Sequence, residues 1–260
     1  MKKQNEKIWG VDLKTYLLLT TLGILGSLAA LPYVQNILGE VAKDINIWFF
    51  FAQMSISMII LVFFGLKISK KIGLNTTPLI DKKTKLKEIL KPSIKGGILA
   101  AILIILITNI EIILKGGFMA TLEEQVITLP PFWQPLLASF YGGITEELIM
   151  RLFALSFYAF IIIAIIKIFK KRKWEAGSKV IWTAIILSSI LFGIGHLGAV
   201  ASTTTLTVYL ILQTIILNAI GGIIFGWLFW KKGLESAMIA HFSADIILHV
   251  IWPLALTLLV

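Results

Sequence analysis

The chain has 260 residues, of which 58% are hydrophobic, and its formal net charge is +10. A soluble globular domain is usually about 45–50% apolar, so a single water-soluble core of this size cannot bury so much hydrophobic surface. The chain contains no cysteine, which excludes a disulfide framework and a metal site with cysteine ligands. The cationic residues cluster between apolar runs, where contact with lipid headgroups explains them better than nucleic acid does. Composition therefore predicts membrane lipid, and no nucleic acid, as a partner.

The apolar runs are long and continuous, which predicts helices. Backbone groups in hydrocarbon must be paired within the protein, and a spanning helix needs roughly 20 apolar residues. In chain order the predicted spans are Tyr16–Leu38, Ile47–Leu66, Gly96–Leu114, Phe132–Ile166, Val180–Gly198, Leu206–Trp230 and Leu234–Leu259. The first run is too long for the core of a signal peptide, so we expect a retained span. The predicted fold is an all-α, multi-pass transmembrane helical bundle.

Lysine-rich gaps set the expected topology. Cytoplasmic loops carry an excess of Lys and Arg, which places the amino-terminal end in the cytoplasm. The same rule places three further basic segments in the cytoplasm if Phe132–Ile166 crosses once. These are Lys67–Lys95, Lys167–Lys179 and Lys231–Lys232. Two crossings would give eight spans and put the last two basic segments outside. We favour seven spans in the cell membrane.

Ionisable residues inside spans are expensive, so they are candidates for function. The ionisable residues with the clearest pattern all follow Pro131. We therefore expect a catalytic core over residues 132–260. Residues 1–131 would form an amino-terminal transmembrane region with a basic loop over 67–95. The first group is Glu146, Glu147 and Arg151. Glu147 and Arg151 are four apart on one helix face and can pair, while Glu146 points about 100° away and is left as a candidate general base. The alternative is an ion-pair cluster that locks two helices together.

The second group is Phe192 and His196, with Gly193 and Gly195 between them. The glycines predict close approach of another helix at this point. A lone histidine in a span can also simply bond to a backbone carbonyl, and that alternative stays open.

The third group is His241 and Asp245, four apart on one helix face. Such a pair can hold a metal, orient a water molecule or stabilise an oxyanion. His249 continues this face, but packing or a hydrogen bond between helices explains it, so it is left outside the predicted site. Three spans thus supply a glutamate, two histidines and an aspartate, which need partners in lipid and together suggest hydrolytic chemistry.

Over Phe140–Ile247 the motifs resemble the CPBP family of intramembrane proteases, which includes the CAAX prenyl endopeptidases of the Rce type and bacterial Abi proteins. The family pattern is Glu-Glu-x-x-x-Arg, then Phe-x-x-x-His, then His-x-x-x-Asn or a similar polar residue in place of the Asn. The corresponding residues here are Glu146, Glu147, Arg151, Phe192, His196, His241 and Asp245. Met150 and Leu152 stand where the family often has Phe and Gly, which alters packing more than chemistry.

The resemblance implies an endopeptidase that cleaves a membrane-associated peptide or protein. Glu146 and His196 would activate a water molecule, His241 with Asp245 would stabilise the oxyanion, and Glu147 with Arg151 would position these groups. Asp245 replaces the family's Asn, and an ionised carboxylate cannot donate a hydrogen bond. Asp245 would therefore be protonated, bind a metal, or orient His241.

Alternatives to this mechanism remain at the level of sequence. In a second version of the protease, zinc is held by the two histidines and a carboxylate, whereas the first version needs no cofactor. A non-enzymatic scaffold, such as a bacteriocin-immunity or regulatory protein, would keep the polar cluster for structure, and a transporter would use it as a proton relay. One expectation conflicts with a single site: by simple counting, His196 lies near the outer end of its span and His241 near the inner end.

Overall fold

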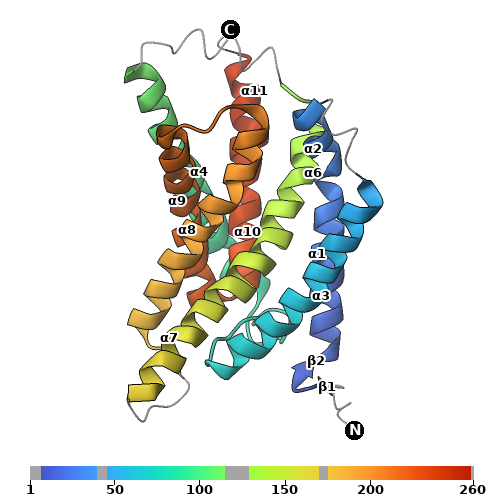
Figure 1. Ribbon diagram of the computed structural model, residues 1–260, viewed down its shortest axis with the longest axis vertical. Helices are drawn as coiled ribbons and strands as arrows, with labels where there is room; N and C mark the ends of the chain where they lie inside the picture. The colour runs from blue at the N-terminus through green and yellow to red at the C-terminus, as the bar shows by residue number, and fades with distance from the viewer. Residues whose placement is uncertain (1–6, 40–45, 115–128, 170–174, 259–260) are drawn as a thin grey trace.

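The computed structural model describes residues 7–39, 46–114, 129–169 and 175–258. Within these ranges the chain is almost entirely helical (Figure 1). Its helices, including π-helical segments marked η, are α1 (Leu13–Ala29), α2 (Leu31–Leu38), α3 (Ile47–Lys71), α4 (Leu86–Leu114), α6 (Trp133–Phe140), η2 (Tyr141–Glu146), η3 (Leu148–Leu155), α7 (Ser156–Phe169), α8 (Ser178–Thr203), α9 (Val208–Lys232), α10 (Leu234–Asp245), η4 (Ile246–Ile251) and α11 (Trp252–Leu256).

Seven segments of the described chain are long and apolar enough to cross a membrane, as the sequence predicts. They are Leu13–Leu38, Ile47–Lys71, Leu86–Ile110, Trp133–Phe169, Ser178–Thr203, Val208–Lys232 and Leu234–Leu256. The strands in the described ranges form one small antiparallel hairpin, β1 (Lys7–Ile8) and β2 (Val11–Asp12), which the sequence did not indicate. The all-α bundle is therefore confirmed.

The connector after the second span is shorter than predicted. A polar segment was expected over Lys67–Lys95, but α3 continues to Lys71 and α4 begins at Leu86. Lysines are good helix formers, and Lys70 and Lys71 lie in the last turn of α3, where cations stabilise the carboxyl end of a helix. The predicted end of α3 and start of α4 were therefore wrong, because both were placed from the charged residues alone.

The long stretch that was ambiguous between one and two crossings forms a single oblique rod (Figure 1). It comprises α6, η2, η3 and α7, and its middle is π-helical rather than α-helical. π-helical turns are rare and often lie at functional sites. Tilt lets one segment longer than the bilayer cross once.

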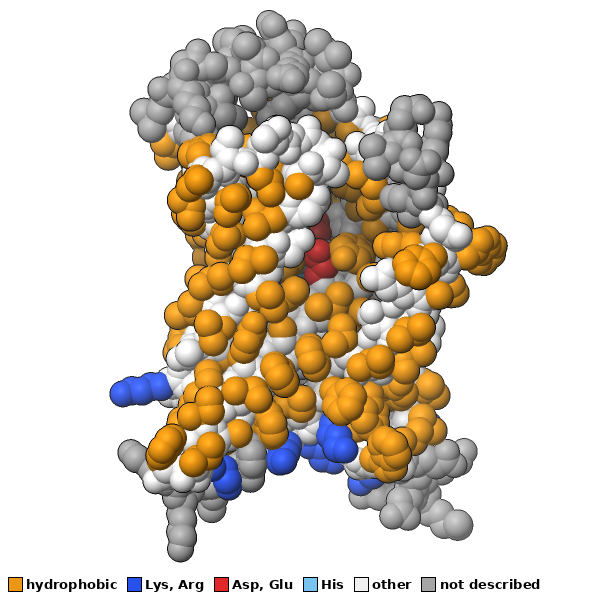
Figure 2. Space-filling model, viewed as in Figure 1, with side chains coloured by type: hydrophobic (Ala, Val, Ile, Leu, Met, Phe, Trp, Pro, Cys, Tyr) orange, Lys and Arg blue, Asp and Glu red, His pale blue; other side chains and the backbone are white. Residues whose placement is uncertain are grey.

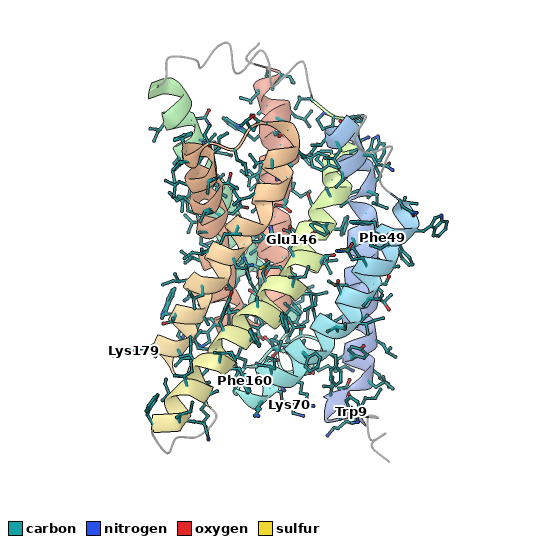
Figure 3. The ribbon with its side chains drawn as sticks, viewed as in Figure 1. Trp9, Phe49, Lys70, Glu146, Phe160 and Lys179 are labelled. Carbon is teal, nitrogen blue, oxygen red and sulfur yellow. The ribbon has the colours of Figure 1, made fainter. Side chains whose placement is uncertain are left out.

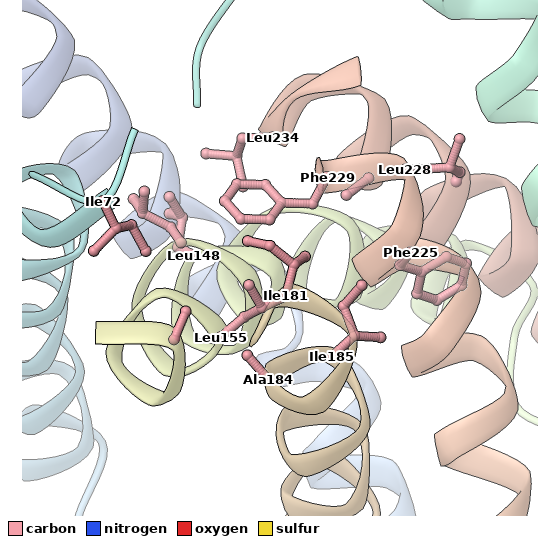
Figure 4. Packing of buried hydrophobic residues seen from close by; sticks show 14 of the residues in the cluster. Ile72, Leu148, Leu155, Ile181, Ala184, Ile185, Phe225, Leu228, Phe229 and Leu234 are labelled. Carbon is pink, nitrogen blue, oxygen red and sulfur yellow. The ribbon is translucent and has the colours of Figure 1, made fainter. Parts of the chain in front are cut away.

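Apolar side chains form the interior and also cover the outside. Figure 4 shows buried residues from η3, α8, α9 and α10 packed together, among them Leu148, Leu155, Ile181, Ile185, Phe225, Phe229 and Leu234. Many other large apolar side chains are exposed, and in Figure 2 they cover most of the visible face. Such a surface suits lipid rather than water. The chain is a multi-pass membrane protein.

Lysine and arginine side chains gather at the lower end of the face drawn in Figure 2. Lys70 and Lys179 are labelled in this half of the molecule in Figure 3. By the positive-inside rule, this is the end expected in the cytoplasm.

Glycine packing between α8 and α9 gives a matched test. A Cβ atom on Gly193 would lie 2.5 Å from Ile215 Cα and 2.8 Å from Ile215 O, whereas one on Gly195 would have no heavy atom of the described chain within 4 Å. The expectation of close helix approach is therefore confirmed at Gly193 and wrong at Gly195.

We predict that Gly193→Ala lowers the free energy of unfolding by about 1–3 kcal/mol, because backbone atoms of Ile215 cannot yield as a side chain would. Gly195→Ala, two positions away on the same helix, should be neutral or slightly stabilising, because alanine is the better helix former. Unfolding in detergent measures both. Equal effects of the two variants would contradict this packing.

Candidate active site

The structure brings the three predicted groups of ionisable residues together. Glu146 Oε1 lies 3.9 Å from His196 Nε2, and Glu146 Oε2 lies 3.7 Å from His241 Nε2. Glu146 ends η2, His196 lies in α8, and His241 lies in α10. One carboxylate thus faces two imidazoles that come from two other spans.

The conflict in depth between His196 and His241 is resolved by tilt and by the starting point of α10. In Figure 1, α8 crosses the bundle obliquely and its first turns lie lower than those of α10. The first residue of α10, Leu234, donates its backbone N–H to Thr76 O (2.7 Å), in the segment between α3 and α4. Counting from helix ends failed because the helices do not begin at one level.

A fully buried chain of charges lies behind Glu146. Arg151 Nε is 3.3 Å from Glu147 Oε2, and both side chains have no exposed surface, as the i, i+4 spacing predicted. Glu147 Oε1 lies 2.8 Å from His241 Nδ1, which can donate its N–H to the carboxylate. Glu147 therefore connects Arg151 to His241 and so joins two spans.

Two phenylalanine rings enclose this chain. The Arg151 guanidinium lies 5.1 Å from the Phe192 ring and 5.6 Å from the Phe225 ring, within the range of cation–π attraction. The His241 ring stacks on Phe225 and meets Phe192 edge-on. The aromatic residue of the second motif thus contacts the residues of the first and third. Phe225, on α9, was not singled out from the sequence.

Hydrogen bonds fix which nitrogen of each histidine faces Glu146. His196 Nδ1 lies 2.9 Å from Phe192 O, and because a carbonyl only accepts, Nδ1 carries the proton. The backbone bond foreseen as the structural alternative is therefore present, yet it leaves Nε2 turned toward Glu146. In the same way, His241 Nδ1 is engaged by Glu147, and its Nε2 faces Glu146 and Asp245.

Asp245 lies beside His241, with Oδ1 3.5 Å from Nε2. Across from the pair is Gly142, where a Cβ atom would collide with Asp245 Oδ2 and lie 3.2 Å from His241 Nε2. A Cβ on Gly143 would lie 2.8 Å from Phe242 Cβ. Sequence reasoning missed these glycines, although a Gly-Gly pair shortly before Glu146 in an apolar helix was a signal of close helix packing.

The site is exposed on one side and sealed on the other. The Glu146 side chain is 16% exposed, that of His196 34% and that of Asp245 14%, whereas Glu147 and Arg151 are fully buried. Figure 2 shows acidic side chains at the bottom of an opening in the apolar surface, near the height at which Figure 3 labels Glu146. A ligand from outside can therefore reach Glu146 and His196.

His249 takes no part in these contacts. It is exposed, and its ring lies 6.5 Å from that of Tyr33 on α2. It makes no ion pair to Glu146 among the contacts of the described residues.

A zinc site makes specific demands on the number and arrangement of its ligands. Within the part of the chain that the structure describes, no group of three or more His, Asp or Glu side chains is arranged to hold one. A zinc site needs three protein ligands at least, at about 2.0–2.2 Å from the ion for nitrogen and oxygen. The described residues therefore form no such ligand set in this structure.

Comparison with known proteins finds a family match over the part of the chain that holds the three motifs. Residues 128–247 match the family model described as Type II CAAX prenyl endopeptidase Rce1-like. This match covers just under half of the chain and includes all three motifs. No curated protein and no solved structure matches the chain. In these residues the chain is similar to the Rce1-like type II CAAX prenyl endopeptidases, in agreement with the resemblance to the CPBP family noted from the sequence.

The chain departs from the family pattern at Met150 and Leu152, and the structure shows how Leu152 is packed. Leu152 is fully buried, and a Cβ atom on Gly65 of α3 would lie 2.7 Å from Leu152 Cγ. The bulk of Leu152 is thus matched by a glycine on the facing helix.

We predict that Arg151→Met lowers the free energy of unfolding by about 3–5 kcal/mol, because it removes the guanidinium that pairs with Oε2 of the buried Glu147 carboxylate. Arg151→Lys should retain part of this stability, since a lysine keeps the charge but lacks the planar guanidinium between the two rings. Denaturation in detergent tests both variants. Stability of Arg151→Met equal to that of the unmodified protein would show that the ion pair is dispensable.

Proposed function

We propose that the chain is an intramembrane endopeptidase that hydrolyses a peptide bond in a membrane-associated peptide or protein. The observation that carries the proposal is the position of Glu146 between His196 Nε2 and His241 Nε2, at 3.9 and 3.7 Å, on the exposed side of a buried charge chain. The family match supports the same class of reaction.

Glu146 and His196 are proposed to activate the attacking water molecule. An ionised Glu146 and a neutral His196 Nε2 are both acceptors, so they need a donor between them. A water molecule about 2.8 Å from each of two atoms 3.9 Å apart subtends an angle of roughly 90°, which suits its two O–H groups. Both its protons then point to bases, and its lone pairs are free for attack.

His241 and Asp245 are proposed to stabilise the oxyanion. With Nδ1 donating to Glu147, His241 offers Nε2–H only when it carries both protons, and the adjacent Glu147 carboxylate favours that charged form. A protonated Asp245 would add a second donor at the place where the family has an amide. Arg151 and the enclosing rings hold Glu147, and thereby His241, in one orientation.

The proposed reaction balances without a cofactor. The water oxygen bonds to the peptide carbonyl carbon, and the proton it loses passes to Glu146. The oxyanion so formed is held by His241 Nε2–H. When the tetrahedral intermediate collapses, the C–N bond breaks and the proton on Glu146 passes to the leaving nitrogen. The products are a carboxylic acid and an amine.

A purely structural cluster fits the geometry less well. The buried contacts of Glu147 with Arg151 and His241 would suffice to lock the spans together. Glu146, His196 and Asp245 are partly exposed in an apolar surface, where they cost energy and contribute little to packing. Their exposure favours an enzyme over a scaffold.

We also propose a division of labour along the chain. Residues 132–260 form the catalytic core in the cell membrane, and residues 1–131 support it. Two contacts favour this arrangement: Thr145 Oγ1 donates to Gly23 O of α1 (2.8 Å), and Gly65 of α3 adjoins Leu152. The substrate would enter from surrounding lipid through the opening beside Glu146.

Separate replacement of Glu146 and His196 by alanine tests the catalytic roles. Loss of a general base typically costs about 10²–10⁴-fold in rate, so each variant should lose peptide cleavage in liposomes by at least about 100-fold. His249→Ala is the matched control, because it removes a third histidine within a span that has no contact with Glu146, and it should leave cleavage unchanged. Thermal melts confirm folding. If both folded variants cleave at the normal rate, the protease proposal is wrong.

Chelator treatment separates the two versions of the mechanism. The donor set predicts that cleavage continues after treatment with a strong chelator and that purified protein contains no stoichiometric zinc. Metal analysis by mass spectrometry and cleavage assays with and without chelator measure this. Loss of activity that returns on adding zinc would establish the zinc version instead.

A further inference from the structure

Glu235 is a buried carboxylate in the first turn of α10 that the proposed reaction does not use. It is 8% exposed. Its Oε1 accepts hydrogen bonds from the backbone N–H groups of Leu79 (3.1 Å) and Ile80 (3.0 Å). Both groups belong to residues 72–85, the segment between α3 and α4. One carboxylate oxygen thus accepts two backbone hydrogen bonds and ties the first turn of α10 to this segment.

Other contacts hold the start of α10 against the same segment. Leu234 N donates to Thr76 O (2.7 Å), as noted above. Gly233, which joins α9 to α10, has φ +95°, and a Cβ atom there would collide with the Pro78 ring. The first turn is also tied to α4, where Ser236 Oγ lies 2.7 Å from Ser93 Oγ. The axial position of α10 is therefore set at its first turn.

That position determines where His241 lies. His241 follows Glu235 by six residues, about 9 Å along a helix that rises 1.5 Å per residue. A helix this short moves as a rigid rod, so a shift of its first turn carries His241 along. The contact at risk is the 2.8 Å bond from His241 Nδ1 to Glu147 Oε1, which a slip of about 1 Å would break.

We propose that Glu235 is a positioning residue, which holds α10 at the height where His241 meets Glu147 and Glu146. It acts through the helix and touches no reacting atom. The inference rests on the proposed function for its kinetic consequences, but the placement of His241 can be measured without any activity.

The kinetic test compares Glu235→Ala, Glu235→Gln and Glu88→Ala. Glu235→Ala should lower kcat for peptide cleavage by about 10–100-fold, the cost of a misplacement near 1 Å, with KM changed less than about twofold. Glu235→Gln keeps an oxygen that accepts both N–H groups and should stay within about threefold of the unmodified protein. Glu88→Ala is the matched control: it removes an exposed carboxylate that bonds Thr84 Oγ1 (2.8 Å) at the other end of the segment, and it should have no effect.

A second measurement reads His241 directly. In protein carrying ¹⁵N-histidine, the Nδ1–H signal that disappears in His241→Ala belongs to the bond with Glu147. This signal should persist in Glu235→Gln and Glu88→Ala and should shift or vanish in Glu235→Ala. Should Glu235→Ala not fold, Glu235→Asp makes the same comparison, because its carboxylate is one methylene shorter.

The outcomes separate the two proposals. An unchanged His241 signal in folded Glu235→Ala or Glu235→Asp overturns the positioning role. An equal fall of kcat in Glu235→Gln and Glu235→Ala overturns it too, since loss of the acceptor would not be the cause. If the signal responds as expected while Glu146→Ala keeps full cleavage, the positioning role stands and only the protease proposal fails.

Discussion

The buried Glu147 carboxylate is the constraint on which the site depends. It has no exposed surface and is held on one side by Arg151 Nε and on the other by His241 Nδ1. A charge in a low-dielectric interior is costly unless it is paired, so the rod that carries Glu147 and the helix that carries His241 must meet here. The rings of Phe192 and Phe225 then close around Arg151. One carboxylate thereby fixes the relation of four spans.

The neighbouring glutamate gains its role from this arrangement. Once Glu147 faces inward, Glu146 is turned aside toward the opening, where it meets two Nε2 atoms without a direct hydrogen bond. Buried and exposed carboxylates thus stand side by side in the chain, one suited to holding a histidine and the other to handling a proton. Gly142 allows this, because any side chain there would displace Asp245 and His241.

Two buried carboxylates, Glu235 and Glu147, hold α10 at two different heights. Glu235 holds the first turn of the helix to the segment between α3 and α4, and Glu147 holds His241 two turns later. Both are buried acceptors whose partners come from distant parts of the sequence. The amino-terminal half of the chain thereby contributes to the site without supplying a residue to it.

Relations within one helix could be predicted from the sequence. The length of the apolar runs predicted the seven spans. The i, i+4 spacing predicted that Glu147 pairs with Arg151 and His241 with Asp245. Both pairs lie within one helical segment, where helical periodicity alone decides which side chains share a face. The catalytic roles of these residues remain predictions. Tertiary structure decided what depends on how helices sit against one another: the common depth of His196 and His241, the partner of Glu147 across the bundle, and the open space at Gly195. Tilt and the anchoring of α10 at Thr76 and Glu235 set these relations, and no periodicity within a single helix contains them.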